Sequence, residues 1–331
     1  MDLVTQGIAG AAVAQAFAPP ERSRQAAFVG LCAGLLPDAD VLIQSAQDPL
    51  LQLEYHRHFT HALISIPFGA LLVAFLLWPL MRAHMPFAIC WKFAGCGYAM
   101  GGLLDACTSY GTHLFWPFSS DPVSLSIIAI VDPVFSLALA IPLVVGVRQR
   151  RPMRTGLVFG MAYLLFGFVQ HERAADVARG VASLRQHVPD QAIVKPTLGN
   201  LLLWRSVYTV GDSVYVDAIY VGDSPRLYPG GSQPLFDVER DLPSALPGSR
   251  VHRDVARFAT AARGFVVASQ EEADFIGDVR YAMLPQRLEP LWGLYVDASN
   301  PEAPVRYVQR RSLAPALRDS FLTMVRGATL Q

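Results

Sequence analysis

The chain has 331 residues, of which 52% are hydrophobic and 16% are charged, and its 27 basic residues balance its 27 acidic ones. An average soluble domain carries about 25% charged residues, so this composition excludes a disordered chain and a basic nucleic-acid-binding protein. The four cysteines lie in apolar stretches without a CxxC pair, so neither a disulfide framework nor a thiolate metal site is expected. We therefore expect a membrane protein with a soluble appendage.

The first two apolar segments, Val4–Ala18 and Gln25–Leu36, are rich in alanine and glycine. They are shorter than the roughly 20 residues that a bilayer core requires. We interpret them as tightly packed or half-spanning helices. No basic region precedes the first apolar run, so the start of the chain is not typical of a signal peptide.

Charged residues are scarce in the apolar segments that follow. Between His61 and Val147 they are Arg82, Lys92, Asp105, Asp121 and Asp132. The candidate transmembrane helices are His61–Met81, Pro86–Leu104, Leu125–Val147 and Thr155–Gln170. Together with the two earlier segments, they predict about four to six membrane helices.

Arginine-rich loops predict how these helices are oriented. The arginines lie between the first two segments, between the next two and before the last, as Arg22, Arg24, Arg82, Arg148, Arg150, Arg151 and Arg154. If all six segments cross the membrane, these loops share one side, which the positive-inside rule assigns to the cytoplasm. The loops Pro37–Thr60 and Asp105–Ser124 and the tail after Gln170 then face the periplasm of a bacterial inner membrane.

After Gln170 the charged residues reach the density of a soluble domain, and the pattern predicts a mixed fold. Leu201–Val221 alternates apolar and polar residues around Gly211-Asp212, which predicts a β-hairpin. The other expected elements are a loop at Pro225–Ser249, a helix at Val251–Arg263, and strands at Phe265–Ala268, Asp278–Met283 and Leu291–Val296.

The predicted fold class is therefore mainly α. A polytopic helical membrane domain over residues 1–172 is followed by a smaller α+β soluble domain over residues 173–331. Within the tail, Lys195, Asn200, Trp204 and Arg205 have two interpretations. They belong either to a lid over the polar face of the membrane domain or to an ordinary strand surface.

Three polar clusters interrupt the apolar half of the chain. They are Leu36-Pro37-Asp38-Ala39-Asp40, His56-Arg57-His58-Phe59-Thr60-His61, and the stretch from Leu104-Asp105 to His113. Ionisable groups are costly at membrane depth, so such clusters indicate function. In the predicted topology all three meet at one membrane face. Carboxylate and imidazole groups are ligands of Zn²⁺, Mn²⁺ or Fe²⁺, and a site with an open position activates water.

Each cluster also has an interpretation without a metal ion. The two aspartates of the first cluster fit a loop turn. Asp105 fits a helix cap, and His113 with Trp116 fits a pair of interfacial anchors. Asp132-Pro133 interrupts a predicted span and is either a functional kink or a pair satisfied by a neighbouring helix.

At these residues the chain resembles the membrane-bound metal-dependent hydrolases of the YdjM type, a group also described as a domain of unknown function. The resemblance covers roughly the first half of the chain. It depends on PDxD at Pro37–Asp40, HRxxTH at His56–His61 and a third motif centred on Asp105. It implies a distant similarity to bacterial zinc-dependent phospholipase C. The family usually has a histidine four residues before this aspartate, where the present chain has Gly101.

Carried over by position, the resemblance implies a set of metal ligands comprising Asp38, His56, His61 and Asp105. They would hold one or more divalent ions, with Zn²⁺ favoured and Mn²⁺ or Mg²⁺ as alternatives. Asp40 and Arg57 are expected to be catalytic, the arginine by binding an anionic group of the substrate. His58 and His113 are the candidate replacements for the family's histidine, which is absent because this chain has Gly101 at that position.

We therefore predict an integral membrane metal-dependent hydrolase that acts at the outer face through metal-activated water. Its expected partners are the lipid bilayer and an unknown small or lipid-like substrate, for example a phosphoester, and not nucleic acid. The alternative is a catalytically degenerate membrane protein of the same fold, whose soluble tail binds a partner. Gly101 is the residue that favours this alternative.

Overall fold

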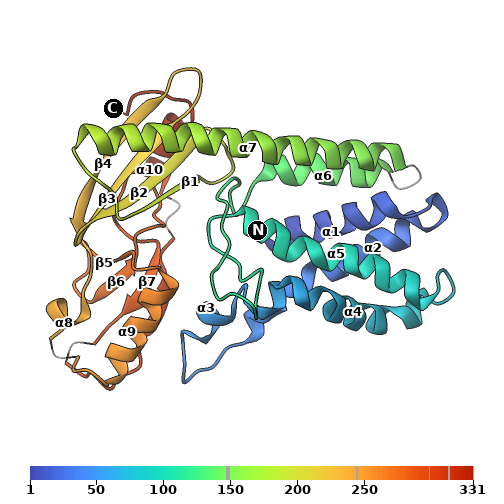
Figure 1. The fold of residues 1–331 in the computed structure, drawn as a ribbon, viewed down its shortest axis with the longest axis horizontal. Coiled ribbons are helices and arrows are strands. Elements are labelled where there is room, and N and C mark those ends of the chain that lie inside the picture. Colours follow the sequence, from blue (N-terminus) through green and yellow to red (C-terminus); the bar gives the residue numbers. More distant parts are fainter. Residues whose placement is uncertain (147–149, 244, 298, 312–313, 331) are drawn as a thin grey trace. The chain divides into compact units, whose positions relative to one another are not determined.

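The computed structural model describes residues 1–146, 150–243, 245–297, 299–311 and 314–330. The chain forms two compact units (Figure 1). The helical unit comprises Met1–Leu42, Tyr55–Val169 and Leu198–Leu201, and the sheet unit comprises Ile43–Glu54, Gln170–Thr197 and Leu202–Gln331. The chain therefore passes between the two units more than once.

The helical unit consists of α1 (Leu3–Phe17), α2 (Ser23–Leu35), α4 (Ile66–Met81), α5 (Phe87–Cys107), α6 (Pro133–Val145) and the first part of α7 (Arg150–Leu184). The C-terminal ends of α1, α4 and α6 lie at one end of this unit, and those of α2 and α5 lie at the other (Figure 1). Four helical stretches are long and apolar enough to cross a membrane: Pro20–Leu42, Leu63–Met81, Phe87–Cys107 and Met153–Leu184.

These stretches confirm the predicted spans His61–Met81, Pro86–Leu104 and Thr155–Gln170, although α7 continues to Leu184. The segment that we expected to be too short, Gln25–Leu36, becomes long enough because helical turns extend it to Pro20–Leu42 at both ends.

The prediction of one span over Leu125–Val147 is wrong, because α6 begins only at Pro133. The preceding residues are not helical and lie beside the end of α5, where Leu125 N donates to Ala106 O (2.8 Å) and Ile127 N donates to Cys107 O (3.0 Å). Asp132 then caps α6 by accepting from two backbone N–H groups. Asp132-Pro133 is thus a helix start and not a kink. Val147 and Arg148 lie outside the described residues.

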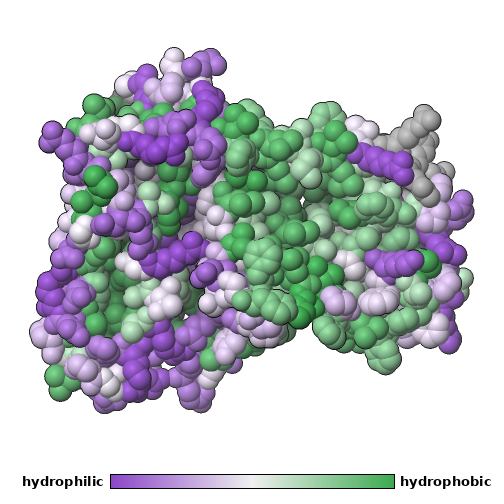
Figure 2. Space-filling view, viewed as in Figure 1, coloured by the Kyte–Doolittle hydropathy of each residue, from purple (hydrophilic) through white to green (hydrophobic). Residues whose placement is uncertain are grey.

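The surface of the helical unit is largely hydrophobic, whereas hydrophilic residues are much more frequent over the sheet unit (Figure 2). Large apolar side chains are exposed along the helices, among them Phe68 and Phe75 on α4, Leu137 on α6, and Phe159 and Leu165 on α7. A helix that exposes such residues needs an apolar solvent. This pattern, with the helix lengths, defines a polytopic membrane domain.

Small residues allow α1, α2 and α5 to pack closely. A Cβ atom on Gly97 of α5 would lie 2.8 Å from Gly30 Cα of α2, and a Cβ on Gly10 of α1 would lie 3.1 Å from Gly34 Cα. Close backbone approach through small residues is typical of membrane helices. It matters here because α2 and α5 carry two of the polar clusters at their C-terminal ends.

We expect Gly97→Ala to destabilise the helical unit by about 2–3 kcal/mol, because the added methyl group overpacks a backbone contact. Gly95→Ala on the same helix is the matched control, since its nearest neighbour would be Ala70 Cβ at 3.9 Å. Thermal unfolding of the full chain in detergent measures both variants. Equal melting temperatures for the two variants would contradict this account of the packing.

The sheet unit contains two four-stranded antiparallel sheets. The first has the order β1 (Gln191–Pro196), β2 (Leu203–Val210), β3 (Ser213–Tyr220), β4 (Arg226–Pro234), and the second has the order β5 (Val266–Ala268), β6 (Phe275–Asp278), β7 (Trp292–Tyr295), β8 (Arg306–Gln309). The helices are α3 (Leu51–Tyr55), α8 (Val238–Asp241), α9 (Arg250–Ala261) and α10 (Pro315–Val325). The hairpin around Gly211-Asp212 and the helix near Val251–Arg263 are confirmed.

Two predictions in this unit are wrong. The expected loop Pro225–Ser249 contains β4, which pairs with β3 despite its prolines because the register shifts between Tyr215 and Asp217. The expected strand Asp278–Met283 ends at Asp278, because the Asp278 side chain accepts from Arg280 N and the chain turns there.

Lys195 and Arg205 lie on paired strands and are buried, as is Trp204. Lys195 Nζ lies 3.1 Å from the centre of the Tyr281 ring, and Arg205 donates to backbone carbonyl groups such as that of Pro285 (2.6 Å). Burial, together with the neighbouring Arg205 charge, holds the pKa of Lys195 well below its usual value. These side chains therefore belong to the interior of the sheet unit and do not form a lid surface.

Candidate metal centre

The three polar clusters meet at the end of the helical unit where α2 and α5 terminate. Asp38 and Asp40 lie on a 3₁₀ turn (Pro37–Leu42) that directly follows α2. His61 ends a second 3₁₀ turn (Phe59–His61) shortly before the span Leu63–Met81, and Asp105 lies in the last turn of α5. All four side chains are buried. The prediction that the clusters share one end of the helices therefore agrees with the structure.

Asp38, His61 and Asp105 form the first group of candidate ligands. His61 Nε2 lies 3.1 Å from Asp38 Oδ1 and 3.2 Å from Asp105 Oδ2. One ligand atom from each residue lies within 4.8 Å of the others. These residues come from three separate segments of the chain, and one ion is within reach of all three.

Asp38, Asp40 and His56 form a second group that meets the same distance limit of 4.8 Å. His56 lies just after α3, and its Nδ1 atom is 2.8 Å from Asp40 Oδ1. Because Asp38 belongs to both groups, the four predicted ligands are divided into two overlapping sets. His56 and His61 do not join a common set among the described residues.

Asp40 organises the histidine segment around it. Its Oδ2 atom accepts from Arg57 N (2.9 Å) and from the Thr60 hydroxyl group (2.8 Å), and it lies 3.3 Å from His61 Nδ1. Together with the His56 contact, both carboxylate oxygens are in use. The carboxylate therefore fixes the orientation of both imidazole rings, as partners of metal-ligating histidines commonly do.

Arg57 is buried beside Asp105. Its Nε atom lies 3.0 Å from Asp105 Oδ2, and its Nη1 group donates to Thr108 Oγ1 (3.0 Å). The backbone of Arg57 has a positive φ of 64°, which is uncommon for a residue with a side chain. The hydrogen bond from its N–H group to Asp40 helps to hold this conformation.

The electrostatic environment of His61, which precedes the span Leu63–Met81, strongly favours a charged ring. Burial disfavours the imidazolium form, but the neighbouring carboxylates of Asp105, Asp38 and Asp40 outweigh burial and raise the pKa of His61 to about 10. In this arrangement one imidazole ring connects three carboxylates.

Further residues contact the site and were missing from the predicted set, among them Met1, whose N-terminal ammonium group pairs with Asp105. Gln6, on α1, is fully buried and donates from Nε2 to Asp105 Oδ1 (3.2 Å). Thr108 is buried and binds Arg57. The available signal for Gln6 was a long polar side chain in a helix otherwise rich in alanine and glycine.

Gly101 packs tightly against the first polar cluster. A Cβ atom at this position would lie 2.8 Å from Pro37 Cγ, directly before Asp38. A histidine therefore does not fit here unless the PDxD turn moves. The candidate replacements His58 and His113 contact each other, with ring centres 4.6 Å apart, but neither belongs to the two ligand groups found among the described residues.

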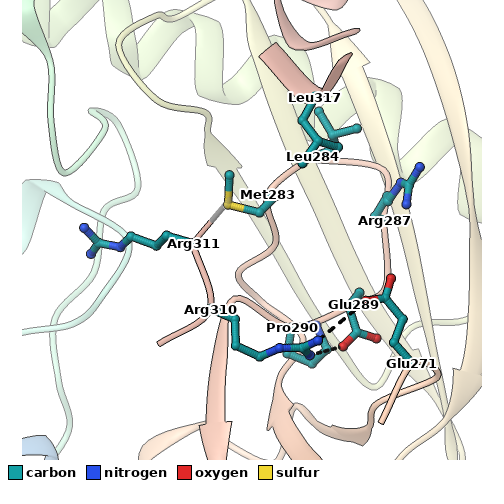
Figure 3. Close-up of a pocket in the computed structure, with 9 residues that line it drawn as sticks. All are labelled: Glu271, Met283, Leu284, Arg287, Glu289, Pro290, Arg310, Arg311 and Leu317. Atoms are coloured by element: carbon teal, nitrogen blue, oxygen red, sulfur yellow. Dashed lines mark hydrogen bonds and ion pairs between the residues drawn. The ribbon is translucent and has the colours of Figure 1, made fainter. Parts of the chain in front are cut away.

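A pocket of about 250 Å³ lies elsewhere, in the sheet unit. Its lining includes Arg310, which reaches Glu289 and Glu271 (Figure 3). This lining consists of arginine, glutamate, methionine, proline and leucine residues, without histidine or cysteine. The pocket is therefore separate from the aspartate–histidine cluster and does not resemble a metal site.

These features define a polytopic membrane protein that gathers buried aspartate and histidine side chains at one end of its helices. The chain belongs to the YdjM inner membrane protein family, whose model matches residues 1–174. The match covers the helical unit and the start of the tail, and it identifies the chain as an inner membrane protein. Neither the curated proteins nor the solved structures provide a match to this chain.

Proposed function

We propose that this protein is a metal-dependent hydrolase of the inner membrane. The observation that carries the proposal is the convergence of Asp38, His61 and Asp105, from three distant segments, on one buried position at the end of the membrane helices. Oxygen and imidazole donors in this combination are those of catalytic Zn²⁺ sites, and Mn²⁺ or Mg²⁺ are alternatives where carboxylates dominate.

The donor set fits a divalent ion. The buried Oδ2 atom of Asp105 makes ion-pair contacts with Arg57 Nε (3.0 Å) and His61 Nε2 (3.2 Å), but it accepts no well-aligned hydrogen bond within the described part of the chain. A buried carboxylate oxygen of this kind is a candidate for coordinating an ion in exchange for these contacts. The proposed ligands are Asp38, His56, His61 and Asp105. Because Asp38 is common to both groups, a second neighbouring ion would share Asp38 and would need Asp40 as a ligand in addition to His56.

A divalent ion in such a site supplies Lewis-acid polarisation of the substrate and activation of water. Around it, Asp40 would orient the rings of His56 and His61, and it is the proposed carboxylate for accepting a proton. Arg57 supplies a positive charge beside Asp105 and is the proposed contact for an anionic substrate group. To bind a substrate, its guanidinium group would have to exchange its contact with Thr108.

An exposed apolar surface beside the cluster supports a lipid-like phosphoester as the substrate. Its residues are Phe59, Leu63, Ile64, Phe115, Trp116 and Phe118. Leu63 N donates to Leu114 O (2.9 Å), which joins this surface to the start of a membrane span. Aromatic residues favour the membrane–water boundary. With the arginine-rich connections at the other end of the helices, the positive-inside rule favours a periplasmic site and tail.

The decisive experiment is metal analysis of the full chain purified in detergent, followed by hydrolysis assays on a phospholipid and on a water-soluble phosphodiester. We expect one or two Zn²⁺ ions per chain and hydrolysis that a chelator abolishes and Zn²⁺ restores. Faster hydrolysis of the phospholipid would support the lipid-like substrate. A purified chain that neither contains nor binds Zn²⁺, Mn²⁺ or Mg²⁺ would refute the proposal.

The alternative is a non-catalytic member of the same fold. Two observations favour it: Arg57 already balances the charge of Asp105, and Gly101 leaves no room for a further histidine. A chain that binds Zn²⁺ but hydrolyses neither substrate would support this alternative.

A further inference from the structure

The segment Ile43–Glu54 connects two of the ligand motifs. It follows the turn that carries Asp38 and Asp40, and it ends two residues before His56. The segment belongs to the sheet unit, although the residues on both sides of it belong to the helical unit. Each residue of an extended chain spans at most about 3.6 Å. The distance between the two ends of this segment therefore limits how far apart Asp40 and His56 can lie.

Apolar contacts hold the middle of the segment in the sheet unit. Leu50 is fully buried and belongs to a core cluster with Val251, Val255 and Phe258. Leu53 packs against the same cluster. Burial of these leucine side chains removes apolar surface from water and stabilises the packing of the segment. The connection is thus part of a folded core and not a free linker.

Arg257 of α9 fixes two further points of the segment. Its Nε and Nη2 groups donate to Glu54 Oε1 (2.6 Å) and Oε2 (2.8 Å). Its Nη1 and Nη2 groups donate to Asp48 Oδ1 (3.1 Å) and Oδ2 (2.9 Å). An arginine bound to carboxylates through paired hydrogen bonds defines geometry more strictly than a simple ion pair does. Glu54 lies on α3, whose last residue directly precedes His56.

We propose that Arg257 is a positioning residue for the candidate metal centre. It holds Glu54 and Asp48, and through α3 it keeps the His56 ring against Asp40. This inference rests on the proposed function and concerns the ligand group of Asp38, Asp40 and His56. The group of Asp38, His61 and Asp105 does not include His56, which closely follows the segment, so it does not depend on Arg257 in this way.

The test compares Arg257→Leu with Arg310→Leu in the full chain in detergent. Arg310 is the matched control, because it also binds several carboxylates of the sheet unit, those of Glu271, Glu272 and Glu289, none of which lies in the segment. Zn²⁺ affinity is measured by competition with a chromophoric chelator. Hydrogen exchange of the peptide around His56 is measured without metal.

We expect Arg257→Leu to weaken Zn²⁺ binding about tenfold, within the range seen for residues that support metal ligands. The same variant should accelerate exchange around His56, whereas Arg310→Leu should change neither quantity. Arg257→Lys should restore binding only in part, because an ammonium group cannot hold both carboxylates through paired bonds. Glu54→Gln removes the contact from the other side and should reproduce the effect, and it replaces Arg257→Leu if that variant does not fold.

Unchanged Zn²⁺ affinity and unchanged exchange in both Arg257→Leu and Glu54→Gln would overturn the proposal. So would an equal loss of affinity in Arg310→Leu, because the effect would then reflect general destabilisation of the sheet unit. Failure of the proposed function would give a different result, because the wild-type chain itself would then bind no metal ion. In that case both proposals are wrong.

Discussion

His61→Ala is expected to lower the Zn²⁺ affinity of the protein by at least about a hundredfold, because residues that merely support metal ligands already contribute 10- to 100-fold. The His61 Nε2 atom lies 3.1 Å from Asp38 Oδ1 and 3.2 Å from Asp105 Oδ2, so all three groups are close enough to bind one ion. Metal content after purification and Zn²⁺ titration of the refilled protein measure the effect.

His58→Ala is the matched control, because His58 is three residues away in the same motif and belongs to neither ligand group. We expect this variant to retain its metal and to lose at most the ring contact with His113. If His58→Ala and His61→Ala retained equal amounts of metal, the proposed ligand assignment would be wrong. Membrane insertion of both variants should match the wild type, since both residues precede Leu63, where the span Leu63–Met81 of the structure begins.

Asp105→Asn is expected to destabilise the helical unit by about 3–5 kcal/mol even without metal, because it leaves the buried Arg57 without its carboxylate partner. The variant Arg57→Met should have a smaller effect, since Asp105 retains the contacts with His61 and Gln6. The double variant should be less destabilised than the sum of the two single effects, by about 1–3 kcal/mol, because residues in contact are coupled.

Unfolding of the full chain in detergent with a chelator present measures this coupling without a contribution from metal binding. Strict additivity of the two substitutions would show that Arg57 and Asp105 do not stabilise each other. The same variants separate the contribution of Asp105 to stability from its proposed contribution to metal binding. The double variant should recover part of the stability while its Zn²⁺ affinity stays as low as that of Asp105→Asn.

Structural features that depend on residues close together in the chain were predictable from the sequence. The apolar runs of α4 and α5 are long enough to identify them as membrane helices. Gly211-Asp212 between two alternating segments identifies the β2–β3 hairpin. The residue types of the PDxD and HRxxTH motifs also indicated which side chains would gather at the ends of these helices, because ionisable groups are rare in such surroundings.

The tertiary structure alone decided the features that depend on residues far apart in the chain. The residues before α6 are not helical, because the end of α5 accepts the hydrogen bonds of Leu125 and Ile127. Gln6 reaches Asp105 across 99 positions, and Arg257 reaches Glu54 across 203. Such contacts are set by how helices and sheets pack. The pattern of residues along the chain does not show that packing. The motifs therefore determined which ligands were available, and packing determined how they are grouped.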